Sequence, residues 1–430
     1  MTGGRGDAAA HAVLDRAHRQ SWPGMLASVI ATARDFDLAE DALQHAFVVA
    51  ASRWPEDGIP ERPEGWLVTA ARRRAIDVQR RETTLARKAP LLLVDREQAA
   101  GESAADPDAP AILQDEELRL IFTCCHPALA AESRLALILR FACGLETPDV
   151  ARLLLVQESA MAARLTRTRK KLREAGISFR VPAGDDLDRR LPVVLHALYL
   201  LFTEGLLPHR GDSAVRSDVL ARAGTLVSLI ARTFPQYPEA VGLHALCLLS
   251  MARLPSRVGQ GGAVIPLERQ DRTRWDRTAI VEGCRLTRQA LVASGPTPGR
   301  FTLEAAIAAL HADAASMETT DWPMVVAIYN VLAKVAPSPT VALARAMAIG
   351  ERDGPAAGLA AVDAVASGNG GDHRVFAARA RFLERLGQHG QARDAARRAH
   401  ALASNERERQ FLEDRVRELE QADLLGHGMP

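Results

Sequence analysis

The chain has 430 residues and an almost balanced charge, with 54 Lys and Arg against 53 Asp and Glu. This balance excludes a protein that coats nucleic acid with its whole surface, so any DNA-binding charge must be local. The length allows two to four domains. Aromatic residues make up only 4% of the chain, and long alternations of Val, Ile and Thr are absent. We therefore predict an all-α protein.

Membrane and export signals are absent from the sequence. No run of about 18 apolar residues occurs, which argues against a membrane-spanning helix. The first 20 residues lack the apolar stretch of a secretory signal. The cysteines are odd in number and form no disulfide pattern: Cys124, Cys125, Cys143, Cys247 and Cys284. Free thiols in a reducing compartment are the simplest interpretation, so we expect a cytoplasmic protein with no membrane contact.

The N-terminal region reads as a series of helices. Residues 11–33 have apolar positions at helical spacing, and the Trp22-Pro23 pair predicts a break into two helices. A capped turn at residues 35–37 precedes a helix over 38–52, which Trp54-Pro55 should end. That helix has a polar face of Glu40, Asp41, Gln44 and His45. From the residues alone, this face is best interpreted as solvated surface.

Two basic helices stand out in this neutral chain. The first begins at Trp66 and carries Arg72, Arg73, Arg74, Arg80 and Arg81. An acidic stretch rich in small residues, Pro and Gly follows at 95–111, which is typical of a linker. The second basic helix lies about eighty residues further on. Two separate basic helices suggest one extended anionic partner.

Residues 145–175 predict a helix-turn-helix. Thr147 is a suitable N-cap, and Pro148 fits the first helical position. The second helix has one apolar stripe of Met161, Leu165, Thr168 and Leu172. Its other face is cationic, with Arg164, Arg167 and Lys171 flanked by Arg169, Lys170 and Arg173. A buried stripe opposite a basic stripe is what a major-groove reader needs, although a solvated basic helix would show the same pattern.

Residues 191–425 predict a long helical region. Two segments, 341–365 and 376–402, align at an offset of 36 residues and carry small residues at matching positions. This pattern favours tetratricopeptide-like hairpins, which stack and leave a concave surface. An Ala-rich helical bundle remains an alternative.

Two clusters of residues are candidates for ligand sites. Cys124, Cys125 and His126 lack a second Cys or His pair at zinc spacing, so we predict no metal. The charged loop 269–277, with Arg272 and Trp275, could line a regulatory pocket or form a salt-bridged surface. No Walker loop, Gly-rich dinucleotide turn or nucleophile motif is present, so we expect no enzyme activity and no cofactor.

Taken in order, several segments resemble the extracytoplasmic-function sigma factors of the sigma-70 family. They are DLAEDALQHAF…RWP, PEGWLVTAARRRAIDVQRRE, the acidic linker, and RFACGLETPDVARLLLVQESAMAARLTRTRKKLREAGISFRVP. The remainder, with HALYLLFTEGL and LERQDRTRW, resembles a subgroup with a helical, tetratricopeptide-like C-terminal extension. The resemblance implies a region 2 domain at 10–90, a linker at 91–113, a region 4 helix-turn-helix domain at 114–180 and the extension at 190–425.

The resemblance also implies partners and site residues. Core RNA polymerase would be bound through its β′ clamp helices and β flap, with Asp41, Gln44 and Phe47 as contacts. Promoter DNA would be held at the −10 element by Trp66, Arg72, Arg73, Arg74 and Arg80. The −35 element would be read by Arg164, Arg167, Arg169 and Lys171. Trp66 could equally be a core anchor of its helix. A fused extension leaves room for a regulatory partner at the C-terminal domain.

Two other functions remain open at this point. The chain could be a transcription regulator that binds DNA without joining polymerase, although residues 37–81 would then have no evident role. Alternatively, the helical region 191–425 could be an enzyme or scaffold, for which the sequence offers no catalytic constellation.

Overall fold

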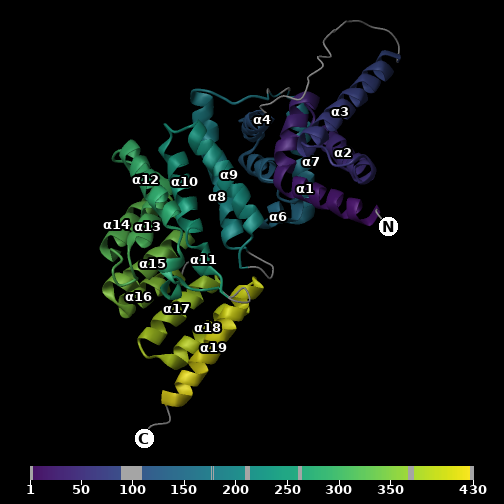
Figure 1. Ribbon diagram of the computed structural model, residues 1–430. Coiled ribbons are helices and arrows are strands. Elements are labelled where there is room, and N and C mark those ends of the chain that lie inside the picture. The colour runs from purple at the N-terminus through teal and green to yellow at the C-terminus, as the bar shows by residue number, and fades with distance from the viewer. Residues whose placement is uncertain are drawn as a thin grey trace. The chain divides into compact units, whose positions relative to one another are not determined.

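The structure is a computed structural model that describes residues 3–88, 109–175, 177, 179–208, 214–259, 264–366 and 372–426. These residues form helices and contain no strand, only one isolated bridge between Val258 and Val264 (Figure 1). The predicted all-α class is confirmed. The chain divides into two compact units, residues 1–201 and 202–430. None of the described helices is long and apolar enough to cross a membrane.

The first unit begins with three long helices and continues with shorter ones. Its elements are α1 (Gly3–Ala33), α2 (Phe36–Asp57), α3 (Pro63–Lys88), α4 (Ala109–Cys124), α5 (Ala131–Leu137), a π-helical turn (Ile138–Ala142), α6 (Thr147–Leu153), α7 (Glu158–Glu174) and most of α8 (Asp185–Leu206). Its core contains fully buried side chains from α1, α2 and α3, among them Met25, Leu26, Leu43 and Leu67. Residues 91–108 of the predicted linker, 91–113, lie outside the described residues.

Two predicted helix ends are wrong. α1 continues through Pro23, and α2 continues through Pro55 to Asp57 before Gly58, whose φ is +87°. Both prolines follow a buried tryptophan, Trp22 at 8% exposure and Trp54 at 3%. Burial of a large side chain outweighs one lost backbone hydrogen bond, so the helix continues past the proline.

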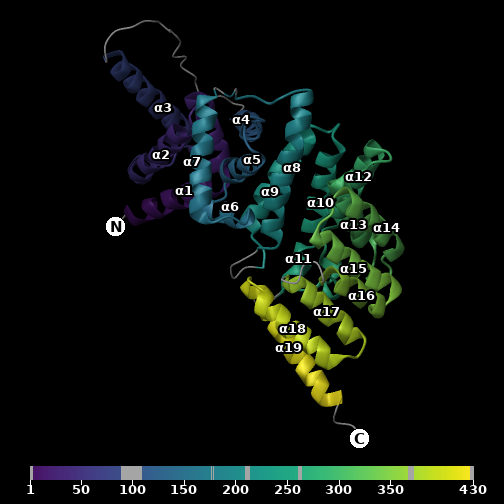
Figure 2. The same cartoon turned by 180° about the vertical axis from the view of Figure 1, so that it is seen from behind.

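Unit 2 is a series of antiparallel helices that pack on their sequence neighbours (Figure 2). It contains the end of α8, α9 (Ser217–Thr233), α10 (Pro238–Met251), α11 (Leu254–Arg257), α12 (Arg277–Ser294), α13 (Arg300–Asp313), α14 (Trp322–Val335), α15 (Pro339–Asp353), α16 (Pro355–Ala366), α17 (His373–Arg385), α18 (His389–Leu402) and α19 (Glu406–Gly426). Two single 3-10 turns, Leu267–Arg269 and Arg272–Arg274, lie between α11 and α12.

The two repeat segments each fold as a helix pair, α15–α16 and α17–α18. The helices of the second pair begin at His373 and His389, 34 residues after Pro339 and Pro355 at the start of the first. The spacing of the helix starts thus differs by two residues from the predicted offset of 36. The small residues of the sequence alignment permit several registers.

Candidate nucleic-acid interface

α6 and α7 form two helices joined by a short turn. The N-cap position of α6 is Glu146, one residue before the predicted Thr147, and Glu146 makes no capping hydrogen bond with its side chain. Pro148 lies in the first turn. The turn places Leu155 in the left-handed region at φ +53°, with its side chain 92% exposed. The predicted stripe of Met161, Leu165, Thr168 and Leu172 is buried, as expected. This is the arrangement of a helix-turn-helix.

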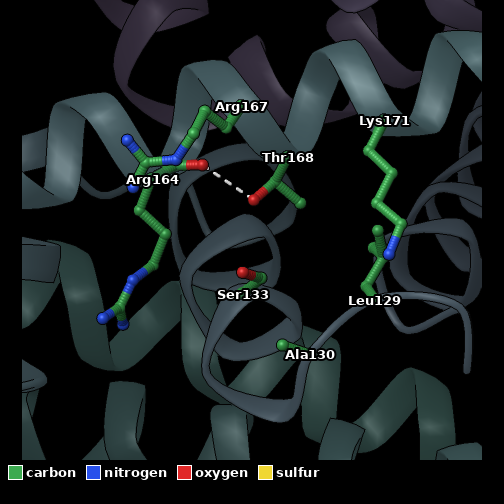
Figure 3. A pocket seen from close by; sticks show the side chains of 7 residues that line it. All are labelled: Leu129, Ala130, Ser133, Arg164, Arg167, Thr168 and Lys171. Carbon is green, nitrogen blue, oxygen red and sulfur yellow. Dashed lines mark hydrogen bonds between the residues drawn. The ribbon is translucent and has the colours of Figure 1, made fainter.

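The cationic face of α7 borders a cavity shared with α5. Arg164, Arg167, Thr168 and Lys171 line it from α7, and Leu129, Ala130 and Ser133 line it from the α5 end; its volume is about 270 Å³. Arg164 and Lys171 reach toward α5 on either side of Ser133 (Figure 3). Thr168 does not point a free hydroxyl into this space, because its Oγ1 donates to the Arg164 carbonyl at 2.7 Å.

Positive charge around this cavity is only weakly neutralised. Arg164 lies 3.4 Å from the Glu132 carboxylate, whose side chain is 77% exposed. An exposed pair of this kind contributes little stability and is easily exchanged for another anion. Arg167 and Lys171 have exposed side chains. The cavity can therefore accept a phosphate-sized anion between three cations.

The other basic residues of α7 face α2. Arg169 Nη1 lies 2.5 Å from Asp37 Oδ1 and 3.6 Å from Glu40 Oε2. Arg173 contacts Asp35 at 2.7 Å and Asp37 at 2.6 Å. α7 thus has two basic faces, one open and one held by carboxylates at the start of α2.

The π-helical turn supports this second face. Arg140 reaches Glu40 at 2.8 Å, and the Arg169 guanidinium lies 5.7 Å from the centroid of the Phe141 ring. Phe141 in turn packs edge-on against Phe36. The interpretation of Glu40 as solvated surface does not hold, because its carboxylate is shared by two arginines.

The arginines of α3 also lie on two faces, one directed inward and one exposed. Arg72 points inward, donating to Ser28 Oγ at 2.7 Å and to Glu116 at 3.0 Å. Arg73, Arg74 and Arg80 have exposed side chains. Their spacing follows from the buried positions Leu67, Ala71 and Ala75, which fix the outward face of the helix.

Trp66 lies at the start of α3 and is half-buried. Its ring meets that of Trp54 at 5.6 Å in an edge-to-face contact. This geometry gives it an anchoring contact and leaves part of its surface accessible.

The outward face of α2 carries the residues predicted to meet polymerase. Asp41 and Gln44 are exposed, and Phe47 is half-buried against the rings of His18 and Trp22 at 5.8 and 5.5 Å. The same face presents Val48, which is 69% exposed and was not predicted as a site residue. Val48 is difficult to recognise as a surface residue from the sequence, because an apolar residue within a helix of mixed pattern is usually assigned to the core.

The two further clusters bring together no set of metal-binding side chains among the described residues. Cys124 and Cys125 are fully buried, and burial raises the pKa of Cys125 to about 12, so its thiol stays protonated. No group of three or more His, Cys, Asp or Glu side chains suited to a metal occurs in the described part of the chain. Trp275 is 3% exposed and belongs to the core of its loop.

Comparison with known proteins adds two domain matches. Residues 119–172, from α4 to α7, match the family model of sigma-70 region 4. Residues 190–291, from α8 to α12, match a family of unknown function (DUF6596). The helix-turn-helix described above lies inside the first match.

A relative covers almost the whole chain. The uncharacterized protein R00370 of Rhizobium meliloti (strain 1021) is 38% identical over 400 residues, which are 93% of this chain and 94% of the relative. The chain belongs to one family with that protein, and its residues 119–172 are similar to sigma-70 region 4. No solved structure matches it.

Proposed function

We propose that this chain is a sigma factor of the extracytoplasmic-function type, which binds core RNA polymerase and directs it to promoters. The observation that carries the proposal is the open basic cavity of α7, set in a region 4 domain within the same compact unit as α1–α3. The protein would make no covalent change to DNA. Polymerase would form the phosphodiester bonds, and binding energy would open the −10 region.

The open face of α7 would read the −35 element. Arg164 and Arg167 are the proposed base readers, because arginine pairs with guanine through two parallel hydrogen bonds. Lys171, as a point charge on the same cavity, suits a backbone phosphate. Arg169 faces α2 in this structure, so it would join the interface only after leaving Asp37 and Glu40.

α3 would hold the −10 element. Arg73, Arg74 and Arg80 are placed to follow the backbone, and Trp66 offers an accessible ring edge near the start of the helix. Aromatic surface beside a basic groove is the general means of holding unpaired strands. Arg72 would act from within, because Ser28 and Glu116 hold its guanidinium.

The exposed face of α2 would contact the β′ clamp helices, with Asp41, Gln44 and Phe47 as the contact residues. The helix-turn-helix domain would meet the β flap. Val48 extends this α2 surface with an exposed apolar side chain of the kind that becomes buried in a complex.

Unit 2 would control this activity. The 34-residue spacing of α15–α16 and α17–α18 supports a tetratricopeptide-like array, which is the usual period of that repeat. Such arrays bind partners, so a regulatory partner at this unit is part of the proposal, as is a place of action in the cytoplasm.

The first test is co-elution of the purified full chain with sigma-free core RNA polymerase on size exclusion. We expect a stable complex, and we expect Asp41→Ala with Gln44→Ala to weaken it by about tenfold or more. Asp77→Ala, an exposed acid on α3, is the matched control and should leave the complex unchanged. A chain that binds DNA but never co-elutes would instead be a regulator acting without polymerase.

The second test separates base reading from phosphate binding. Arg164→Ala or Arg167→Ala should reduce promoter affinity by roughly 1–3 kcal/mol and change selectivity. Lys171→Ala should weaken binding to all sequences alike and reduce its salt dependence. Equal, unselective losses for all three variants would contradict base reading by the arginines.

A further inference from the structure

The loop that joins α10 to α12 has its own small core. It is closed at its base by the Asp276 amide, which donates to the Ala252 carbonyl at 2.9 Å. Trp275 fills the centre, and its Nε1 donates to Ser256 Oγ at 2.7 Å. Gln270, also buried, donates to the Ile265 carbonyl at 2.8 Å. In the described part of the loop, these hydrogen bonds hold Trp275 and Gln270 in a small core.

Two arginines contact the Trp275 ring, and a third lies near them. The guanidinium carbons of Arg253 and Arg272 lie 5.5 and 4.8 Å from the centroid of the Trp275 ring. Arg257 follows Arg253 by four residues, at the end of α11. All three side chains are partly buried. Two positive charges thus lie over the Trp275 ring, and Arg257 is close enough to Arg253 to act on its charge.

Hydrogen bonds within the described residues satisfy few of the donors of these arginines. Arg253 donates once, to Gln270 at 3.4 Å, and Arg257 donates to no described residue. Arg272 Nη1 donates to the carbonyls of His311 and Ala314, while its Nη2 is buried without a partner. Each guanidinium carries five N–H donors, so most of these donors have no partner among the described residues.

The described residues also provide no carboxylate within 4.0 Å of any of the three guanidiniums. Glu408 and Glu318 act on Arg257 and Arg272 only at longer range. The Glu408 carboxylate lies instead 3.2 Å from His373 Nε2. The guanidiniums of Arg253, Arg257 and Arg272 therefore have no direct counter-ion among the described residues.

This lack of pairing is unfavourable. Burial, together with the neighbouring Arg257 and Arg272, lowers the pKa of Arg253 to about 10. Burial likewise lowers the pKa of Arg257. Charges withdrawn from water are normally paired, because their loss of hydration is otherwise not compensated. An unpaired cluster beside this small core is better suited to bind an anion than to stabilise the fold.

We infer that Arg253, Arg257 and Arg272 form a binding site for a small molecule that carries a phosphate or carboxylate group. The planar guanidinium fork matches both oxyanions and binds them through paired, charge-assisted hydrogen bonds. His311, whose Nδ1 is buried without a partner, lies beside the arginines and offers a further polar contact. The site lies within the segment matched by the family of unknown function.

The loop is also tied to helices near the end of the chain. Glu268 pairs with Arg381 of α17 at 3.0 Å, and Arg269 with Glu418 of α19 at 3.8 Å. A ligand bound by the arginines would therefore be linked, through a few residues, to the last helices of the array. This linkage would let occupancy of the site influence a surface of unit 2.

The test is calorimetric titration of the full chain with inorganic phosphate and, separately, with succinate, in a low-chloride buffer at constant ionic strength. We expect phosphate, succinate or both to bind with one site per chain. We expect the same anion to raise the melting temperature by roughly 2–4 °C once it saturates the site. Arg257→Gln should weaken binding at least about tenfold. Arg288→Gln, an exposed arginine on α12, is the control and should bind like the unmodified chain.

A structural role for Arg257 predicts a different result. If Arg257 stabilised the fold, Arg257→Gln would lower the melting temperature in the absence of the anion. Our proposal predicts that it stays the same or rises, because an unpaired buried charge is removed. Binding of phosphate alone would identify phosphorylated molecules as the ligand class. Binding of succinate alone would identify carboxylates as the ligand class. Binding of neither anion, or equal binding by Arg257→Gln, would overturn the proposal.

Discussion

Arg173 of α7 and Asp37 of α2 are joined by an ion pair of 2.6 Å between Nη2 and Oδ2. Asp37 also forms an ion pair with Arg169, with 2.5 Å between Oδ1 and Nη1, so one carboxylate holds two basic residues of the helix proposed to bind DNA. In a sigma factor these residues would be withheld from DNA until α2 and α7 separate. The pairs are partly exposed and individually weak, so DNA phosphates can compete with them.

Asp37→Asn should therefore strengthen binding of the full chain to duplex DNA. We expect a gain of about two- to five-fold at low salt, which corresponds to the loss of exposed pairs worth roughly 0.4–1 kcal/mol. Fluorescence anisotropy with a labelled duplex measures it. Asp41→Asn makes the same change of charge on the same helix, where no ion pair is formed with a described residue. Equal gains from both variants would show a net-charge effect and contradict a role for the pairs.

Leu155 has a backbone conformation that is unfavourable for leucine. A leucine at φ +53° is strained, and with 92% of its side chain exposed it gains little from burial. Leu155→Gly should raise the free energy of unfolding by up to about 1 kcal/mol, since glycine adopts this conformation without a Cβ clash. Chemical denaturation measures the change. Leu155→Ala keeps the Cβ atom and should show almost none of the gain.

His311 makes unit 2 sensitive to acid. Burial, together with Arg253 and Arg272, lowers the pKa of His311 from 6.5 to about 4 in the folded chain. Because the unfolded chain binds this proton more readily, stability decreases as the pH falls from about 6.5 toward about 4. The loss is on the order of 3 kcal/mol and levels off below that range.

His311→Gln should remove this component of the pH dependence. The stability difference between the variant and the unmodified chain, measured by denaturation at several pH values, should change in favour of the variant as the pH falls through this window. A difference that stays constant from pH 7 to 4 would mean that His311 titrates normally. Bound anion beside His311 should reduce the acid sensitivity, because it would favour the protonated ring.

Local patterns predicted the helix-turn-helix well. The apolar stripe of α7 and the cap at Asp35 are determined by neighbouring residues, and both appear as expected. Helix ends at prolines were predicted less well, because burial of Trp22 and Trp54 depends on distant parts of the chain. Residue type alone could not reveal this tertiary contribution.

The residues of the candidate site could be predicted from the sequence, but their ion pairs could not. Arg164, Arg167 and Lys171 share a face by helical spacing, and the structure places them on one cavity. In contrast, Arg72 and Arg169 look like their exposed neighbours in the sequence. Their partners Glu116 and Asp37 lie more than 40 residues away, so only the fold brings each pair together.

The most direct test of the sigma-factor proposal is transcription of fragmented genomic DNA by sigma-free core polymerase, with and without the full chain, followed by mapping of RNA 5′ ends. The proposal predicts reproducible new start sites that appear only with the chain and that share sequence at the −35 and −10 positions. Arg164→Ala should change or abolish the −35 preference. An unchanged set of start sites, from a chain that is folded and binds DNA, would contradict the proposal.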